Sequence, residues 1–331
     1  MDKFLYTKEI EDETSVVHQK LDGAIPDEEW RIHAPLIVEI NRLKKERNAV
    51  ILAHNYQTPE IYHGVADLVG DSLGMARLAS EIDAEVIVVA GVHFMAETAK
   101  LLSPDKKVLI PDPEAGCSLA DSITAEDVRM MKDSHPGLPV VTYVNTSAAV
   151  KAETDICCTS ANAVEVVESL DSDKVIFLPD EHLGRYVATK TDKELILWMG
   201  SCEVHRIFTA EEIRDLRRKY KGVEVVAHPE CPLEVLEEAD FVGSTSGMIK
   251  HVDQNRPPRV VLMTECSMSD NIAVEFPDTE FIRPCNLCPH MKKISLRNIY
   301  QTLETMEPEI IIPVKIAAAA RRSVQRMLEI S

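Results

Sequence analysis

The sequence predicts an α/β fold of three related three-layer αβα modules, each with a parallel four-stranded sheet, in a pseudo-threefold arrangement around a common centre. Short runs of Val, Ile and Leu alternate with segments of helical periodicity, a pattern typical of parallel sheets covered by helices on both faces. Cys117, Cys202 and Cys288 each follow a strand-like run, and they are 85 and 86 residues apart, which indicates a repeated unit. No low-complexity linker divides the repeats, so we expect them to pack tightly.

Module 1 is predicted over residues 36–135, after an acidic extension (residues 1–35) that we expect to pack loosely. It opens with a helix over residues 36–47, whose basic final turn suits a helix C-terminus. Three strands follow, at residues 50–53, 85–90 and 107–110, and the helices between them are predicted at residues 59–69, 73–82 and 93–102. Because this sheet is one strand short, the run at residues 310–312 is predicted to complete it, which places segment 305–331 in module 1.

Modules 2 and 3 repeat the alternation of strands and helices over residues 136–220 and 221–304. The strands expected in module 2 are residues 139–143, 155–158, 174–178 and 195–198. Those expected in module 3 are residues 223–227, 241–242, 259–263 and 280–282. Helices over residues 294–306 and 315–329 are predicted to close the chain.

The composition favours a cytoplasmic enzyme. The formal net charge of −19 argues against nucleic-acid binding, because neutralising phosphates requires clustered Lys and Arg. The chain has no run of about 18 apolar residues, so no membrane span is expected, and its N-terminus lacks the apolar core of a signal peptide. With eight cysteines and no export signal, we expect reduced or metal-bound thiols rather than disulfides.

Polar side chains follow most of the predicted strands, at the sheet edge where parallel α/β proteins bind ligands. Helices that begin at this edge also offer free N–H groups and a positive dipole end to anions. The residues at these positions include His54, Tyr56, Tyr143, Asn145, Ser160, His228, Glu230, Ser244, Thr245 and the three cysteines. An alternative role for Ser72, Ser160 and Thr245 is helix capping, and His54 or His228 could each be a structural histidine.

The string His228-Pro229-Glu230 places an imidazole and a carboxylate at one strand end. Pro229 restricts His228 to an extended conformation, which would fix its direction. Such a pair could shuttle protons in a condensation or a dehydration. The alternative role for Glu230 is to complement the dipole of the helix that follows.

The cysteines allow more than one kind of site. Three thiolates on one iron–sulfur cluster would leave a fourth metal position free, and an iron with an open position is a Lewis acid. The pair Cys285-x-x-Cys288 is also compatible with zinc, with Cys231 or His290 as a further ligand, or with a redox dithiol. The redox role is not favoured, because the pair does not open a βαβ unit. The other thiols are assigned to strand packing or have no assigned role: Cys157, Cys158 and Cys266.

Ten short strings occur between Val50 and Met291 in the order found in one known family. They are Ala53-His54-Asn55-Tyr56-Gln57, Gly70-Asp71-Ser72, His93-Phe94-Met95-Ala96-Glu97, Asp112-Pro113-Glu114-Ala115-Gly116-Cys117-Ser118-Leu119-Ala120-Asp121, Tyr143-Val144-Asn145, Thr159-Ser160-Ala161-Asn162, Cys202-Glu203-Val204-His205, His228-Pro229-Glu230-Cys231, Gly243-Ser244-Thr245-Ser246-Gly247-Met248 and Cys288-Pro289-His290-Met291. The chain resembles the quinolinate synthases, iron–sulfur enzymes of de novo NAD biosynthesis.

This resemblance implies that Cys117, Cys202 and Cys288 hold a [4Fe–4S] cluster whose fourth iron faces the substrates. It favours Cys288 over Cys285, because the family's ligand directly precedes Pro-x-Met. The implied reaction condenses iminosuccinate (iminoaspartate) with dihydroxyacetone phosphate to give quinolinate, with loss of phosphate and two waters. The open iron would act as a Lewis acid that eases the loss of an oxygen. Direct transfer of iminosuccinate from L-aspartate oxidase, through a transient contact, is a further possibility.

The resemblance also assigns roles to side chains. Tyr56 and Glu230 are the implied acid–base residues, assisted by His228, while Glu203 and His205 are expected to shape the pocket. The implied substrate-binding residues are His54, Ser72, Tyr143, Asn145, Ser160, His228, Glu230 and Thr245. The family often carries a basic residue shortly after the Thr-Glu of module 3; this chain lacks it, and the candidates for the missing charge are Lys292 and Lys293.

Two other hypotheses use the same thiols. An aconitase-like [4Fe–4S] hydro-lyase would share the open iron but would catalyse a dehydration only. A zinc-stabilised or electron-transfer module would not be an enzyme. Iron content separates the last hypothesis from the first two, and the requirement for dihydroxyacetone phosphate separates those two from each other.

Overall fold

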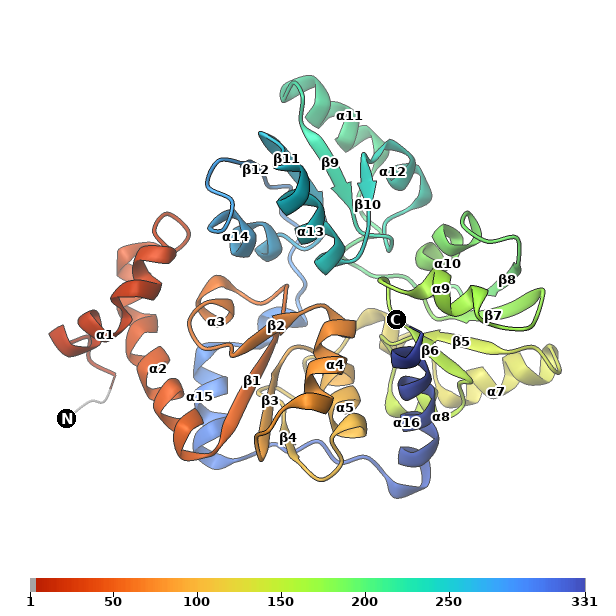
Figure 1. The fold of residues 1–331 in the computed structure, drawn as a ribbon, viewed down its shortest axis with the longest axis horizontal. Helices are drawn as coiled ribbons and strands as arrows, with labels where there is room; N and C mark the ends of the chain where they lie inside the picture. The colour runs from red at the N-terminus through yellow and green to blue at the C-terminus, as the bar shows by residue number, and fades with distance from the viewer. Residues whose placement is uncertain (1–3, 331) are drawn as a thin grey trace.

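Three separate four-stranded parallel sheets make up the chain in the computed structural model, which describes residues 4–330 (Figure 1). Residues 1–3 of the predicted extension and residue 331 of the C-terminal segment lie outside the described residues. The strand order has the same form in each sheet: β2-β1-β3-β4, β6-β5-β7-β8 and β10-β9-β11-β12. The predicted α/β class, with three related units, is therefore confirmed.

The first sheet has a different fourth strand from the one predicted. Its strands are β1 (Ala49–His54), β2 (Leu68–Gly70), β3 (Val86–Ala90) and β4 (Lys107–Leu109). Strand β2, read from the sequence as the end of a helix, pairs in parallel with β1, so the assignment of residues 310–312 to this sheet is wrong. Only an isolated antiparallel bridge joins Glu309 to Leu109. A three-residue strand is too short to show a period of two, which explains the error.

Helices cover both faces of the first sheet. On one face, α2 contacts β1 and α15 contacts β3, and on the other, α4 and α5 pack together against the strands (Figure 1). A short helix, α3, follows β1. The bounds of these helices are Asp27–Glu46 for α2, Pro59–Tyr62 for α3, Ser72–Glu81 for α4, His93–Leu102 for α5 and Leu296–Thr305 for α15.

The second and third sheets lie close to their predicted positions. The second contains β5 (Val140–Tyr143), β6 (Ile156–Cys158), β7 (Lys174–Leu178) and β8 (Glu194–Leu197), with helices α6 (Ser118–Asp121), α7 (Ala125–Ser134), α8 (Ala148–Ala152), α9 (Ala163–Glu168) and α10 (Glu181–Ala188). The third contains β9 (Glu224–Ala227), β10 (Phe241–Val242), β11 (Arg259–Met263) and β12 (Glu280–Ile282), with α11 (Ala210–Lys219), α12 (Leu233–Glu238), α13 (Thr245–Asn255), α14 (Ser267–Ala273) and a 3₁₀ turn (Met291–Lys293). Their strands are apolar and mostly buried, as expected for parallel sheets between helices.

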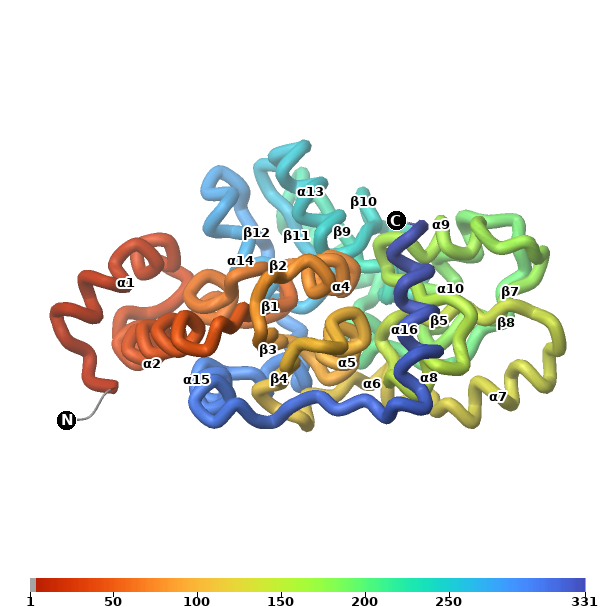
Figure 2. Tube along the Cα trace, turned by 60° about the horizontal axis from the view of Figure 1, so that its bottom comes forward, coloured from red at the N-terminus to blue at the C-terminus, as the bar shows by residue number. Residues whose placement is uncertain are grey.

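The C-terminal helix α16 (Val314–Glu329) joins the first two units. It lies beside α8 and β6 of the second unit and also contacts α5 of the first (Figure 2). Buried side chains from both units and from α16 form one apolar cluster, which includes Leu73, Leu101, Ala148, Val324 and Met327. The helix thus buries its apolar face between two sheets and adds no strand to either.

The N-terminal region packs more tightly than predicted. It contains α1 (Lys8–Lys20) and the first part of α2, which continues through Pro35, so the boundary expected at residue 35 falls inside a helix. Leu21 and Trp30 are fully buried. The Trp30 ring stacks on the His18 ring with centroids 4.8 Å apart. The acidic first turn of α2 favours helix initiation there, which the composition alone did not reveal.

Replacing Trp30 with alanine should destabilise the chain by about 3–5 kcal/mol, because it removes a fully buried aromatic ring and leaves a cavity. Denaturant titration of the purified protein would measure the loss. Ile32→Ala on the same helix is the matched control, since Ile32 is 67% exposed and its truncation should change little. Equal unfolding midpoints for the two variants would mean that the N-terminal helices are not part of the core.

None of the helices within residues 4–330 combines the length and apolar character that a membrane crossing requires.

Candidate active site

A cavity lies where the three units meet. Its walls come from the carboxyl ends of strands in all three sheets, as the strand-end pattern predicted. The lining includes every candidate site residue: His54, Tyr56, Ser72, Cys117, Tyr143, Asn145, Ser160, Cys202, His228, Glu230, Thr245 and Cys288. Residues up to about 230 positions apart in the sequence therefore share one chamber.

Each unit contributes one of the three cysteines to the cavity wall. Cys117 follows β4 of the first sheet, Cys202 follows β8 of the second and Cys288 follows β12 of the third. Burial raises the pKa of the Cys117 thiol to about 12, and nearby Glu230 and Cys288 add to this effect. Burial likewise raises the pKa of Cys202, with further contributions from Glu230 and Cys117. Buried thiols of this kind lose their protons only beside a strong positive charge, such as that of a bound metal. Three sulfur donors fit an iron–sulfur cluster in which one iron has no protein ligand.

Cys285 does not line this cavity, because it forms a disulfide with Cys266. The Cys266 N–H donates to the Asn286 carbonyl (3.2 Å), and Glu265 and Asn286 form a parallel bridge, which brings the two cysteines to a Cα–Cα distance of 5.0 Å. The expectation that the thiols are reduced or metal-bound is therefore wrong for this pair. It failed because the contact joins two loops 19 residues apart that no local pattern brings together.

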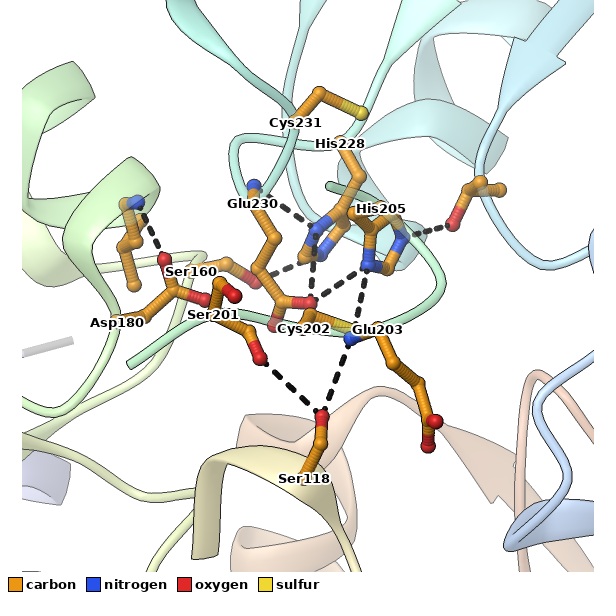
Figure 3. Close-up of polar contacts among 12 residues, drawn as sticks. Ser118, Ser160, Asp180, Ser201, Cys202, Glu203, His205, His228, Glu230 and Cys231 are labelled. Carbon is orange, nitrogen blue, oxygen red and sulfur yellow. Dashed lines mark hydrogen bonds and ion pairs between the residues drawn. The ribbon is translucent and has the colours of Figure 1, made fainter. Parts of the chain in front are cut away.

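The Glu230 carboxylate contacts polar side chains on several sides, among them the His205 and His228 rings (Figure 3). Tyr143 donates its hydroxyl hydrogen to Oε1, and His205 Nδ1 lies 2.7 Å from Oε2. Burial acts to raise the carboxyl pKa, but the imidazoles of His205 and His228 and the Tyr143 hydroxyl outweigh it and hold the pKa of Glu230 below its usual range. The alternative role at the following helix is not observed, since α12 begins only at Leu233 and the carboxylate faces the cavity groups.

His205 joins this carboxylate to one of the cysteines. Its Nδ1 lies 3.2 Å from Cys202 Sγ as well as 2.7 Å from Glu230 Oε2, and its ring stacks on the His228 ring at 4.6 Å (Figure 3). The possible metal-ligating atoms of Cys202, His205 and Glu230 all lie within 4.8 Å of one another. A metal centre held by Cys202 would therefore be beside an acid–base pair.

The predicted binding residues present groups that a substrate could use. His228 Nε2 lies 3.2 Å from Ser160 Oγ, and Thr245 Oγ1 accepts a hydrogen bond from Asn55 Nδ2 (2.8 Å). Among the residues that the structure describes, Asn145 Oδ1 is buried and has no hydrogen-bond partner. A buried acceptor of this kind is normally satisfied by a ligand or water.

Neighbouring residues occupy the N-cap positions that were considered as an alternative role; Asp71 and Ser244 cap with their side chains, whereas Asn162 makes no side-chain capping hydrogen bond. The helices that begin near Ser72, Ser160 and Thr245 have other residues at their N-cap positions: Asp71 for α4, Asn162 for α9 and Ser244 for α13. Ser72, Ser160 and Thr245 are thus left to face the cavity.

The comparisons with known proteins agree with this geometry. A sequence model of the family described as "Quinolinate synthetase A protein" matches residues 38–329, which is most of the chain.

The chain belongs to the quinolinate synthase family.

Relatives named quinolinate synthase match over nearly the whole chain. The protein from Caulobacter vibrioides (strain NA1000 / CB15N) is 58% identical, and the match covers 99% of this chain and 90% of that one. The protein from Agrobacterium fabrum (strain C58 / ATCC 33970) is 62% identical over 95% of this chain and 91% of that one. The Xylella fastidiosa (strain Temecula1 / ATCC 700964) protein is 63% identical over 89% and 87%. Membership of the quinolinate synthase family confirms the resemblance found in the sequence.

For this quinolinate synthase family member, neither candidate lysine reaches the cavity. Lys292 pairs with the fully buried Glu265 (3.0 Å) and donates to the Tyr56 carbonyl oxygen (2.8 Å) and Ser267 Oγ (2.7 Å). Lys293 donates to the Glu114 carbonyl oxygen (2.9 Å). The expectation that one of them supplies the missing charge at the rim is not supported by their positions. No Lys or Arg appears among the described cavity-lining residues.

Sequence reasoning ranked one important residue low and missed two others. His205 was expected only to shape the pocket. Thr264, directly after β11, is fully buried and bonds to Tyr56 and His205. Asp180, two residues after the end of β7, is fully buried near Glu230; its burial, and to a smaller extent the Glu230 charge, raises the pKa of its carboxyl group (Figure 3). Their place at strand ends was the available signal, but a Thr or an Asp there is also a common helix cap.

Acidification from about pH 6.5 towards pH 4 should destabilise this family member, because His54 and His228 are buried in the neutral form. Burial lowers the pKa of His54 to about 4 and that of His228 to about 3. Unfolded histidines titrate near 6.5, so the unfolded state takes up protons first, and the stability that is present above pH 6.5 is lost as the pH falls. Unfolding midpoints measured across this range would show the loss, and His54→Asn should make the slope shallower. A midpoint independent of pH would contradict the neutral assignment.

Proposed function

We propose that this chain is a cytoplasmic quinolinate synthase that condenses iminosuccinate with dihydroxyacetone phosphate to form quinolinate for de novo NAD biosynthesis. The observation that carries the proposal is the convergence of three cysteines, one from each unit, with the Glu230–His205 pair in one cavity. Family membership over nearly the full chain supports the same reaction.

Cys117, Cys202 and Cys288 would hold a [4Fe–4S] cluster, which when bound supplies a Lewis-acidic iron. Glu230 holds its carboxylate in place between Tyr143 and His205, where it can accept or return a proton. His228 stays neutral because burial lowers its pKa to about 3, so its ring can share a hydrogen bond with Ser160 without adding charge. Tyr56 keeps its hydroxyl hydrogen, since burial raises its pKa.

Both proposed substrates are anions, and the cavity would hold them without a lysine or arginine among its described lining residues. Helices α4 and α13 begin at Ser72 and Thr245, and their first N–H groups and positive dipole ends favour carboxylates or phosphate. The unpartnered Asn145 and the Ser160 hydroxyl add neutral polar groups. An anionic substrate held by such groups can be released more readily than one paired with buried cations. Transient contact with L-aspartate oxidase would shorten the exposure of the labile iminosuccinate to water.

The test is an anaerobic assay of protein with a reconstituted cluster. Quinolinate should form only when iminosuccinate and dihydroxyacetone phosphate are both present, and the protein should be brown with about four irons per chain. Dehydration of a hydroxy acid without any need for the sugar phosphate would favour the hydro-lyase hypothesis. Colourless protein that carries zinc and forms no quinolinate would favour the structural or electron-transfer hypothesis.

A further inference from the structure

A buried threonine contacts Tyr56, which was predicted to perform acid–base chemistry, and His205, which was expected only to shape the pocket. Thr264 Oγ1 lies 2.5 Å from the Tyr56 hydroxyl oxygen and 2.9 Å from His205 Nε2. The other ring nitrogen, His205 Nδ1, is 2.7 Å from Glu230 Oε2. A continuous hydrogen-bonded chain therefore runs from Tyr56 through Thr264 and His205 to Glu230.

The directions of the hydrogen bonds in this chain follow from its Glu230 end. A carboxylate can only accept, so the His205 Nδ1 that faces Glu230 Oε2 carries the proton. His205 Nε2 is then a lone-pair acceptor, which requires Thr264 to donate its one hydroxyl hydrogen to it. The Thr264 oxygen is left to accept from the Tyr56 hydroxyl.

This order decides what Tyr56 offers to the cavity. Its hydroxyl hydrogen points towards Thr264 and therefore away from the cavity, since Tyr56 lines the cavity and Thr264 does not. The remaining lone pair of the Tyr56 oxygen is free to face a substrate. A direct bond from Tyr56 to His205 Nε2 would be poor, since those atoms are 3.4 Å apart, so Thr264 is the necessary link.

We propose that Thr264 is a positioning residue that makes Tyr56 a proton acceptor and connects it to Glu230. The proposal rests on the proposed function, since it assigns the direction of proton transfer within that reaction. The substrate gives a proton to the Tyr56 oxygen as the Tyr56 O–H bond breaks towards Thr264. Thr264 passes its hydrogen to His205 Nε2, and His205 Nδ1 passes its own to Glu230. One proton moves from the substrate to Glu230, and Tyr56, Thr264 and His205 end neutral, with the imidazole in its other tautomer.

The device suits a reaction that must remove a proton at one point and release water or phosphate at another. Tyr56 comes from the first unit, His205 from the segment after the second sheet, and Thr264 and Glu230 from the third. All four side chains are buried, with exposures of 9% or less, so bulk water cannot easily replace a link. A neutral Glu230 acid can then protonate a leaving group on its side of the cavity.

Thr264→Val is the decisive variant, because valine has the shape of threonine without the hydroxyl. We expect kcat for quinolinate formation to fall roughly 10²-fold, the range of a single acid–base contribution. The KM values and the cluster's absorbance spectrum should change little, since Thr264 does not line the cavity. Thr264→Ser should recover most of the lost rate.

Thr279→Val is the matched control, because Thr279 has a buried hydroxyl in the same unit. That hydroxyl donates to the Pro257 carbonyl oxygen, at the opposite end of β11 from Thr264.

A double-mutant cycle separates positioning from general destabilisation. If Thr264 acts through Tyr56, Thr264→Val should cause no further loss of kcat in a Tyr56→Phe background. Full additivity of the two losses, unchanged kcat in Thr264→Val, or a Thr264→Ser variant as slow as Thr264→Val would each overturn the proposal. Wild-type protein with a full cluster that forms no quinolinate would instead refute the proposed function, so the two failures are distinct.

Discussion

Cys288→Ser should abolish both the bound cluster and quinolinate formation, whereas Cys285→Ser should keep much of each. The structure places Cys288 in the cavity wall with Cys117 and Cys202, and it places Cys285 outside the lining, bonded to Cys266. If one of the three thiolates is lost, two of the four irons have no protein ligand. A serine hydroxyl seldom replaces a cysteine thiolate as a cluster ligand. Iron content, the visible absorbance of the cluster and the anaerobic assay would measure both variants.

The disulfide calls for a third variant in this comparison. Cys285→Ser frees the Cys266 thiol close to the Cys288 loop, where it could compete for iron. The double variant Cys266→Ser/Cys285→Ser removes that complication and should hold a full cluster. Equal loss of iron from the Cys288→Ser and double variants would mean that the wrong thiol of the Cys-x-x-Cys pair has been assigned to the site.

Glu230→Gln should keep the cluster but lower kcat by about 10²–10⁴-fold, which is the usual contribution of a general acid–base group. The side chain is 3% exposed and its two oxygens contact Tyr143 and His205, so the amide would keep the shape of the site. It would remove the negative charge that accepts hydrogen bonds from Tyr143 and His205, and with it the ability to take up a proton. Steady-state kinetics on protein of matched iron content would measure the effect.

Glu203→Gln is the natural comparison for Glu230→Gln. Glu203 also lines the cavity, but its carboxylate pairs with His290 Nε2 (2.9 Å) rather than with Tyr143 and His205. We expect a much smaller fall in kcat for this variant. Near-normal turnover of Glu230→Gln, or equal losses in both variants, would remove Glu230 from the chemistry.

Much of the architecture could be predicted because it is recorded locally. Continuous apolar runs located most of the strands, and polar residues at their carboxyl ends, such as His54, Tyr143 and His228, identified the edge that carries the cavity. Strand β2 and the tight packing of Trp30 were missed, since a three-residue strand and a single buried ring have no periodicity to detect. The run at residues 310–312 was predicted to be a full strand, whereas this segment makes only one isolated bridge to the first sheet, because counting strands cannot show which surface the following helix buries.

The amino-acid sequence by itself determined the αβ repeat, the three cysteines at nearly equal spacing and the motifs of the quinolinate synthase family. Only the tertiary structure decided that Cys285 bonds to Cys266, that both candidate lysines are occupied away from the cavity, and that Thr264 lies between Tyr56 and His205. The physical reason is range. Strand pairing and helical periodicity act between near neighbours, whereas the Tyr56–Thr264 contact joins residues 208 positions apart and exists only because the three sheets meet at their carboxyl ends.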